Sequence, residues 1–299
     1  MFFVIFSLVI KKFPEYILFL GIILALFAFY IGGDSFLDNL LIFGKSRNIS
    51  NMNTGLFLVS FGTVIDEAAV VIFATIGLHG DISFGTIQGS NVFTLVLTVI
   101  LVVVSGRFIS KKFIPDLAVF LAATLILIFV GLFFRTAPWY VGLIFILIFL
   151  GYTQISRKRR VSKETEGNWK TDPLSIVMSL ILIGTASFAV VDYVSSLSVS
   201  FHIGYFASSF IIIGIAGSLP EIFTIFLSLK KKIWQMTIGI AIGSSIYKGV
   251  LFLGIAFLFS SVNITSGLYS LYAVFSLILI LMIFTLPKGK KIDETKIME

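Results

Sequence analysis

Two adjacent acidic residues, Asp66 and Glu67, lie inside an otherwise apolar stretch, and a third, Glu221, lies in a similar stretch 154 residues later. An ionised carboxylate at the centre of a membrane helix costs about 2.5 to 3.5 kcal/mol on insertion scales, so the three together cost roughly 8 to 10 kcal/mol. Lys248 is the basic residue that falls within an apolar run, and one lysine cannot neutralise three acids. The pattern favours binding of a cation over ion pairs that only hold helices together.

Oxygen ligands for a hard cation are available around these acids. Calcium takes six to eight oxygens at about 2.3 to 2.6 Å, and two glutamates with hydroxyls and released backbone carbonyls can provide them. Pro220, directly before Glu221, has no N–H and so leaves a helix carbonyl without its usual partner. Small residues that let helices approach closely follow both acids: Gly89, Ser90, Gly243 and Ser244.

The composition indicates that these acids belong to a polytopic membrane protein. The chain has 299 residues, of which 58% are hydrophobic and 12% charged, and its mean hydropathy is +1.08. Repeated apolar runs of about 18 or more residues can each cross a hydrocarbon core of ~30 Å. The runs are continuously apolar rather than alternating, so helices are expected and a β-barrel is not. The absence of cysteine excludes disulfides, thiolate metal sites and cysteine nucleophiles.

Nine membrane spans are predicted, near 16–36, 53–77, 86–106, 113–134, 138–155, 174–192, 203–229, 234–260 and 267–286. With the N-terminus outside and the C-terminus in the cytoplasm, 18 of the 22 Lys and Arg residues face the cytoplasm, as the positive-inside rule requires. The cell membrane is the expected location, and no nucleic-acid partner is expected. The predicted division is an N-terminal interfacial segment (1–13), a first membrane repeat (14–155), a basic cytoplasmic linker (156–172), a second membrane repeat (173–286) and a cytoplasmic tail (287–299).

An internal repeat relates the two halves. An offset of 154 residues lays FGTVIDEAAVVIF (61–73) over IAGSLPEIFTIFL (215–227), and GTIQGSNVFTLVL (85–97) over GIAIGSSIYKGVL (239–251), without a gap. The same 22-residue spacing separates the glutamate from a glycine in both copies. Duplication explains this better than chance apolar similarity. Because five spans, an odd number, separate the copies, the second is expected to enter the membrane in the opposite direction.

Each half is expected to bring its acid and its small residues to one depth. Glu67 lies 13 residues before the turn near Gly80, and Ser90 lies 10 residues after it, so about 20 Å and 15 Å of helix return to a similar level. The second copy has 10 and 13 residues on the two sides of its turn. Four helix segments are therefore predicted to converge near the middle of the membrane.

These paired motifs resemble those of the calcium/cation antiporter superfamily, the sodium/calcium exchanger type. Its two inverted repeats each carry a GTSLPE-like signature followed by a GSN-like one, and this chain has GTVIDE with GSN and AGSLPE with GSS. The resemblance covers about residues 14 to 286. It implies an all-α fold of two inverted repeats of about five helices, with a discontinuous helix in each half at the ion site. It also implies a transporter rather than an enzyme, with no cofactor.

The resemblance also implies roles for individual residues. Glu67 and Glu221 match the family's central ion-binding glutamates, and the further implied ligands are Thr63, Ser90, Ser218 and Ser244. Four positions are interpreted as charge partners or coupling residues: Asp66, Asn91, Thr94 and Lys248.

Several positions depart from the family pattern. Asp66 replaces the helix-breaking proline, Val64 stands where a serine is usual, and Gly217 replaces a threonine. Thr94 occupies an asparagine or acid position, and Lys248 occupies a position that is often an acid. An ammonium about 4 Å from a carboxylate attracts it by about 4 kcal/mol at an effective dielectric of 20, so Lys248 competes with a bound cation. The hypothesis is that Lys248 fills a place where relatives bind sodium, with Asp66 as its counter-charge.

The expected function is antiport of calcium, or another divalent cation, against sodium by alternating access. A cation/proton antiporter and a regulatory membrane protein of the same fold without transport remain alternatives. A ten-span metabolite carrier would need a broad pocket instead of converging acids. An intramembrane aspartyl protease, suggested by Gly32, Gly33 and Asp34, would need a second aspartate in a matching motif, which is missing. The expected partners are inorganic cations and the lipid bilayer.

Overall fold

The computed structural model describes residues 15–46, 53–105, 109, 111–157, 172–230, 232–264 and 267–285. The predicted N-terminal segment and C-terminal tail lie outside the described residues, as does most of the predicted linker. Within the described ranges the secondary structure is helical, apart from one isolated antiparallel bridge between Thr136 and Asn263. The predicted all-α fold is confirmed.

The described helices group into nine segments that follow the nine predicted spans in order. They are α2 (Glu15–Ser46); η1 (Thr54–Val59) with α4 (Ser60–Thr63) and α5 (Ile65–Ile76); α6 (Gly80–Ser105); η2 (Lys111–Phe113) with α7 (Ile114–Phe133); α8 (Trp139–Arg157); α9 (Pro173–Ser200); α10 (Tyr205–Ser208) with η3 (Ser209–Ile213), α11 (Gly214–Gly217) and α12 (Leu219–Lys230); α13 (Trp234–Ile246) with η4 (Tyr247–Phe252) and α14 (Leu253–Phe259); and α15 (Gly267–Thr285). By length and apolar composition, six helices of the described residues are able to cross a membrane, or seven if the bent pair Gly55–Thr63 and Ile65–Ile76 is one span.

Irregular backbone features recur at the 154-residue offset, which supports the internal repeat. The π-helices η1 and η3 occupy equivalent positions, and the helix breaks at Val64 and Ser218 correspond to each other. Leu78 and Lys232, which turn the chain into α6 and α13, both have a positive φ, 58° and 60°. Left-handed backbone is uncommon for residues other than glycine, so its recurrence at matched positions is informative. The two breaks differ in degree, because only the first bends its helix by more than 40°, at 56°.

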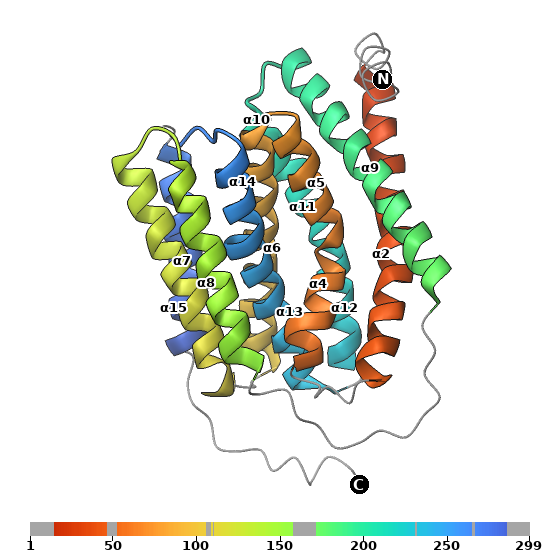
Figure 1. Cartoon of the computed structure of the whole chain (residues 1–299), viewed down its shortest axis with the longest axis vertical. Helices are drawn as coiled ribbons and strands as arrows, with labels where there is room; N and C mark the ends of the chain where they lie inside the picture. Colours follow the sequence, from red (N-terminus) through yellow and green to blue (C-terminus); the bar gives the residue numbers. More distant parts are fainter. Residues whose placement is uncertain are drawn as a thin grey trace, which may run out of the picture.

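The helices form a central group with two flanks (Figure 1). On one flank α2 and α9, the first helix of each half, lie side by side, and α9 also contacts α5. On the other flank α15 packs on α7, and α8 packs on α14. In one 18-residue apolar window of each helix, the buried share is 67% for Gly80–Leu101 and 72% for Trp234–Phe259, but 33% for Pro173–Ser200. The residues around α6 and α13 therefore form the interior, and the flanking helices present most of the surface.

The two repeats cross each other through glycines. Gly89 of α6 lies against Gly214 and the carbonyl oxygen of Phe210, and Gly243 of α13 lies against Ser60 and the carbonyl oxygen of Leu56. A Cβ at either glycine would clash with backbone of the opposite repeat. Because the offset relates the first crossing to the second, this is one contact made twice. Small residues at such crossings let membrane helices approach closely.

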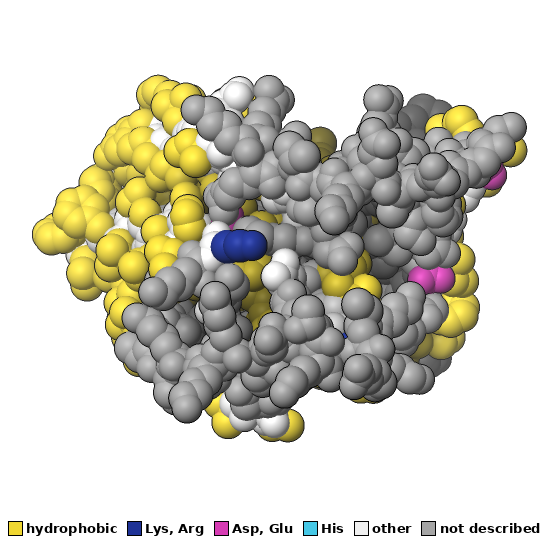
Figure 2. All heavy atoms as spheres, turned by 90° about the horizontal axis from the view of Figure 1, so that it is seen from below, with side chains coloured by type: hydrophobic (Ala, Val, Ile, Leu, Met, Phe, Trp, Pro, Cys, Tyr) yellow, Lys and Arg dark blue, Asp and Glu magenta, His cyan; other side chains and the backbone are white. Residues whose placement is uncertain are grey.

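The outer surface of the described bundle is apolar. Seen from below, hydrophobic side chains cover most of the described surface at its sides, and few described side chains are charged (Figure 2). Exposed apolar side chains include Ile23, Leu24 and Phe27 on α2 and Phe129 and Phe133 on α7. Such a surface is suited to lipid, and the protein is an integral membrane protein.

Candidate cation site

Three helix segments bring the predicted charged residues together. Asp66 and Glu67 lie in the first turn of α5, directly after the break at Val64, and Glu221 lies in the first turn of α12, after the break at Ser218. Lys248 belongs to the π-helix η4. π-helical turns occur often at functional sites, and a helix N-terminus favours negative charge. The predicted convergence of the acids with residues of the neighbouring helices is confirmed.

The Lys248 ammonium is the centre of the cluster. Its Nζ lies 2.5 Å from Oε1 of Glu221 and 3.7 Å from Oε1 of Glu67. It also donates to the hydroxyls of Ser90 at 2.7 Å and Thr94 at 3.2 Å. The side chains of Lys248 and Glu221 are 0% exposed, and that of Glu67 is 1% exposed. A fixed positive charge thus sits between the two equivalent glutamates, one from each repeat.

Ser90 links the ammonium to the first glutamate. Its hydroxyl accepts a hydrogen bond from Lys248 and donates one to Oε1 of Glu67. The predicted meeting of acid and small residue is therefore observed in the first repeat. In the second repeat Glu221 instead bonds Lys248, and the hydroxyl of its matching serine, Ser244, donates to the carbonyl of Ala241 at 3.2 Å.

One oxygen of each glutamate is left over. Among the described residues, Oε2 of Glu67 and Oε2 of Glu221 are buried and have no hydrogen-bond partner. A buried carboxylate oxygen without a partner is costly in an apolar interior. These two oxygens are the strongest candidates for cation ligands, because both belong to equivalent residues of the two repeats.

Asp66 lies at the edge of the cluster. Its side chain is 3% exposed, and Oδ1 accepts a hydrogen bond from the backbone N–H of Glu67 at 2.9 Å. It also interacts electrostatically with Glu221 and Lys248. Glu221 makes the shortest contact with the ammonium, and the role of Asp66 as a counter-charge of Lys248 stays a prediction.

The remaining predicted hydroxyl ligands are buried at the helix breaks. Thr63 donates to the carbonyl of Ser60 at 3.1 Å, and Ser218 donates to the carbonyl of Ile215 at 2.7 Å. Each hydroxyl keeps acceptor capacity on its oxygen. The backbone carbonyls of Ser60, Val64, Gly214 and Ser218 at the two breaks already accept backbone N–H groups. The hydroxyl oxygens of Thr63 and Ser218 therefore remain as acceptors at the breaks.

Gly217 contributes to the site in a way that sequence reasoning missed. A Cβ at this position would lie 2.9 Å from Cγ and 3.1 Å from Oε1 of Glu67. The end of α11 therefore packs directly on the glutamate of the opposite repeat, and a larger residue would displace it. The sequence signal was present, because Gly217 replaces the threonine of the family pattern.

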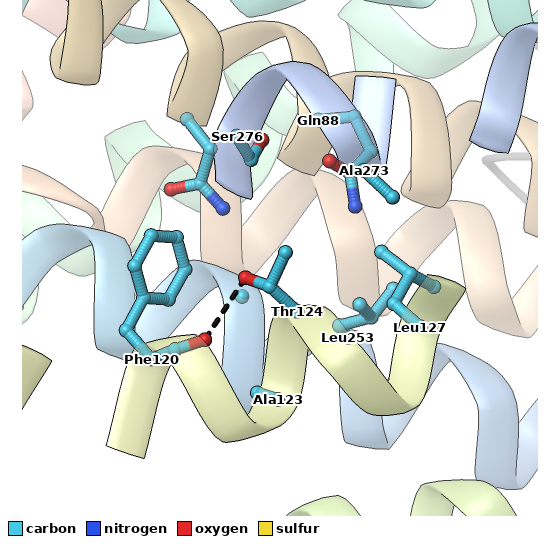
Figure 3. A pocket seen from close by; sticks show the side chains of 10 residues that line it. Gln88, Phe120, Ala123, Thr124, Leu127, Leu253, Ala273 and Ser276 are labelled. Atoms are coloured by element: carbon cyan, nitrogen blue, oxygen red, sulfur yellow. Dashed lines mark hydrogen bonds between the residues drawn. The ribbon is translucent and has the colours of Figure 1, made fainter. Parts of the chain in front are cut away.

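Asn91 faces away from the carboxylates. It lines a small cavity between α6, α7 and α15, with Gln88, Thr124 and Ser276 directed toward the same space (Figure 3). Thr124 donates to the carbonyl of Phe120 at 2.9 Å, while Oδ1 of Asn91 and Oγ of Ser276 have no partner among the described residues. Successive helix residues point about 100° apart, so Asn91 cannot share the direction of Ser90. The predicted involvement of Asn91 with the charged cluster is not seen.

The donor set fits a cation only in part. Among the described residues, no three Asp, Glu or His side chains are arranged as ligands of one metal ion. The ammonium of Lys248 takes up Oε1 of both glutamates, so a metal ion at this place must share the carboxylates with Lys248 or displace it.

Comparisons with known proteins agree with the helical repeat. The family model for sodium/calcium exchanger protein matches residues 17–157 and 172–294. An uncharacterized membrane protein, MJ0091, of Methanocaldococcus jannaschii is 25% identical over 232 residues, covering 75% of this chain and 76% of its own length. The inner membrane protein YrbG of Escherichia coli is 24% identical over 260 residues, covering 81% of this chain and 79% of its own.

Solved structures give the same fold. The sodium-calcium exchanger NCX_Mj soaked with 10 mM Na+ and no Ca2+ has a TM-score of 0.59 and 21% identity, with 91% of this chain and 93% of that chain covered. The same exchanger soaked with 2.5 mM Na+ and 0.1 mM Ca2+ has a TM-score of 0.60 and 22% identity, with 93% of each chain covered.

Proposed function

The chain belongs to the sodium/calcium exchanger protein family, and on that premise we propose that it exchanges calcium, or another divalent cation, for sodium across the cell membrane. Proteins of this family are cation antiporters rather than enzymes, which makes this chain a cation transporter. The finer proposal concerns the ions and the residues that bind them.

The observation that carries the proposal is the pair of equivalent glutamates at the helix breaks. Glu67 and Glu221 come from opposite repeats, are buried, and each keep one carboxylate oxygen without a partner among the described residues. Burying such oxygens is unfavourable unless a cation or water completes their coordination. The proposed ligands are these two residues with Thr63, Ser90, Ser218 and Ser244.

Alternating access follows from the repeat architecture. In inverted-repeat transporters the site lies at the interface of the two repeats, and rocking of one group of helices opens it to either side in turn. The glycine crossings at Gly89 and Gly243 place the two repeats in direct contact. With the N-terminus outside and the C-terminus in the cytoplasm, the two breaks would face opposite sides of the membrane.

The contact of Lys248 with both glutamates favours a second candidate, cation/proton antiport, because a buried lysine or carboxyl that gains and loses a proton can couple proton movement to cation binding. A regulatory protein without transport is a third outcome, since the cluster is already partly neutralised by Lys248.

The test is uptake of radioactive calcium into proteoliposomes under an imposed sodium gradient and then an imposed proton gradient. Uptake driven by sodium and lost in Glu221→Gln supports the proposal. Asp34→Asn, which removes an exposed acid on α2, is the matched control and should retain uptake. Uptake driven only by the proton gradient would favour the second candidate, and no uptake under either gradient would favour a protein that does not transport.

A further inference from the structure

The net charge of the cation site follows from its four ionisable side chains. Three carboxylates, Asp66, Glu67 and Glu221, and one ammonium, Lys248, interact with one another in the buried cluster. The other side chains that contact the ammonium, Ser90 and Thr94, are neutral hydroxyls. With the carboxylates ionised and the lysine protonated, the cluster carries two negative charges in excess.

The position of Asp66 allows its carboxylate to contribute a negative charge to the cluster. It lies in the first turn of α5, where the aligned peptide dipoles and free N–H groups of a helix N-terminus stabilise an anion. Its Oδ1 already accepts the backbone N–H of Glu67 at 2.9 Å, a hydrogen bond that becomes stronger when the carboxyl group is ionised. The proline usual at this position in the resembled pattern would carry no charge.

Asp66 and Lys248 compensate each other. Lys248 adds a positive charge at a position where the resembled pattern often has an acid, and Asp66 adds a negative charge within the same cluster. Without Asp66, the two glutamates and the lysine leave only one negative charge, and a bound divalent cation would remain unbalanced in an apolar interior. Uncompensated charge is strongly unfavourable there.

We propose that Lys248 and Asp66 together fix the site at two net negative charges, so that one divalent cation exchanges for two sodium ions without net charge movement. The inference rests on the proposed function above. Both loaded forms are then neutral, because the ammonium stays with the protein and contributes equally to each. The two free oxygens, Oε2 of Glu67 and Oε2 of Glu221, give each sodium ion one carboxylate oxygen that is not already bonded.

The experiment measures the steady calcium gradient that wild-type protein sustains in proteoliposomes under a tenfold sodium gradient. Two sodium ions per calcium predict about 100-fold accumulation, and three predict about 1000-fold, because each sodium ion contributes one decade of driving force. A membrane potential is then set with potassium gradients and valinomycin. An electroneutral exchanger keeps the same accumulation, whereas exchange that moves one charge shifts it about tenfold for each tenfold potassium gradient.

Charge variants identify the residues responsible. Lys248→Met leaves three net negative charges, so accumulation should rise toward about 1000-fold and become sensitive to the potential. Lys248→Arg keeps the positive charge. It should therefore retain the ratio of two sodium ions per calcium ion, even if its transport rate changes. Asp66→Asn leaves one net negative charge and should lose calcium accumulation, and an unchanged ratio in this variant would contradict the proposal.

The outcomes separate this inference from the proposed function. Calcium accumulation by the wild type that depends on the potential would overturn the electroneutral ratio while leaving sodium/calcium exchange intact. Absence of sodium-driven calcium uptake would overturn both. If Lys248→Met does not fold, the effect of membrane potential on calcium accumulation by the wild type decides whether the exchange is electroneutral.

Discussion

Replacing Lys248 with methionine tests whether the ammonium stabilises the folded protein as an internal cation. Methionine keeps an unbranched side chain of similar length and removes the charge. The Nζ distances of 2.5 Å to Glu221 and 3.7 Å to Glu67 correspond to attractions of about 7 and about 4 kcal/mol at an effective dielectric of 20. Desolvation of the buried charges opposes most of this, and breaking a buried ion pair by removing one partner typically costs about 3 to 5 kcal/mol.

The expected result is a lower melting temperature in the absence of metal ions. A loss of 3 to 5 kcal/mol corresponds to a fall on the order of 10 °C, scaled from domains of comparable size. The assay is thermal unfolding of the purified protein in detergent, in buffers with an organic cation only. Calcium should then restore part of the stability of Lys248→Met, and raise it more than in the wild type, because Oε1 of Glu221 becomes available as a ligand and the competing positive charge is gone.

Arg135→Met, which removes an exposed basic side chain between α7 and α8, is the control and should melt within a degree or two of the wild type. A Lys248→Met protein as stable as the wild type without ions would refute the reasoning, because it would mean that the glutamates do not need a positive charge beside them. A variant that calcium does not stabilise would contradict the idea that Lys248 and a metal ion compete for the same oxygens.

Three other perturbations test the site and its support. Glu67→Gln removes a carboxylate that accepts from Ser90 and should reduce sodium-driven calcium flux at least about tenfold, measured by initial uptake rates, with near-normal flux counting against its role. Gly89→Val places a branched side chain against the carbonyl of Phe210 and should lower stability by about 1 to 3 kcal/mol, whereas Gly151→Ala, where nothing lies within 4 Å, should be neutral or stabilising in the same melting assay. Tyr152→Phe removes the hydroxyl that donates to buried Asp116 at 2.9 Å and should lower stability by about 1.5 to 3 kcal/mol, while Tyr140→Phe at an exposed position should leave it unchanged.

The parts of the fold that depend on periodicity and duplication were predictable from the sequence. The apolar runs predicted nine spans that the described helices follow in order, and the 154-residue offset predicted that equivalent positions would behave alike. The positive φ at both Leu78 and Lys232 and the matched breaks at Val64 and Ser218 agree with that offset. Hydrophobicity and repetition are properties of the chain itself, which is why they can be read without coordinates.

Directions of individual side chains were less predictable. Counting residues along two helices placed Glu67 and Ser90 at one depth, and their hydrogen bond agrees with this. Counting residues does not give the rotation of a side chain about the helix axis. The GSN motif suggests a coupling role for Asn91, whereas its side chain lines the cavity of Gln88 and Ser276. The π-helices η1, η3 and η4 shift the register of the residues that follow, and no propensity signal marks them.

The choice of partner for Lys248 also needed the structure. The sequence shows one lysine and three acids in apolar surroundings, which predicts that the lysine interacts with at least one of the acids. Which acid lies closest depends on how the first turns of α5 and α12 face η4, and on the oxygen that Asp66 gives to the backbone of its own helix. The space that Gly217 leaves for Glu67 is a contact between opposite repeats, and sequence spacing does not contain it.

The most direct measurement is the position of a bound divalent cation in crystals of this protein soaked with strontium, located by its anomalous scattering. If both glutamates bind the transported ion, an anomalous peak is expected within about 2.3 to 2.8 Å of a carboxylate oxygen of Glu67 and of one of Glu221. The peak should be absent in Glu221→Gln crystals. Strontium bound elsewhere in well-ordered wild-type crystals, with Lys248 still between the two glutamates, would contradict the account.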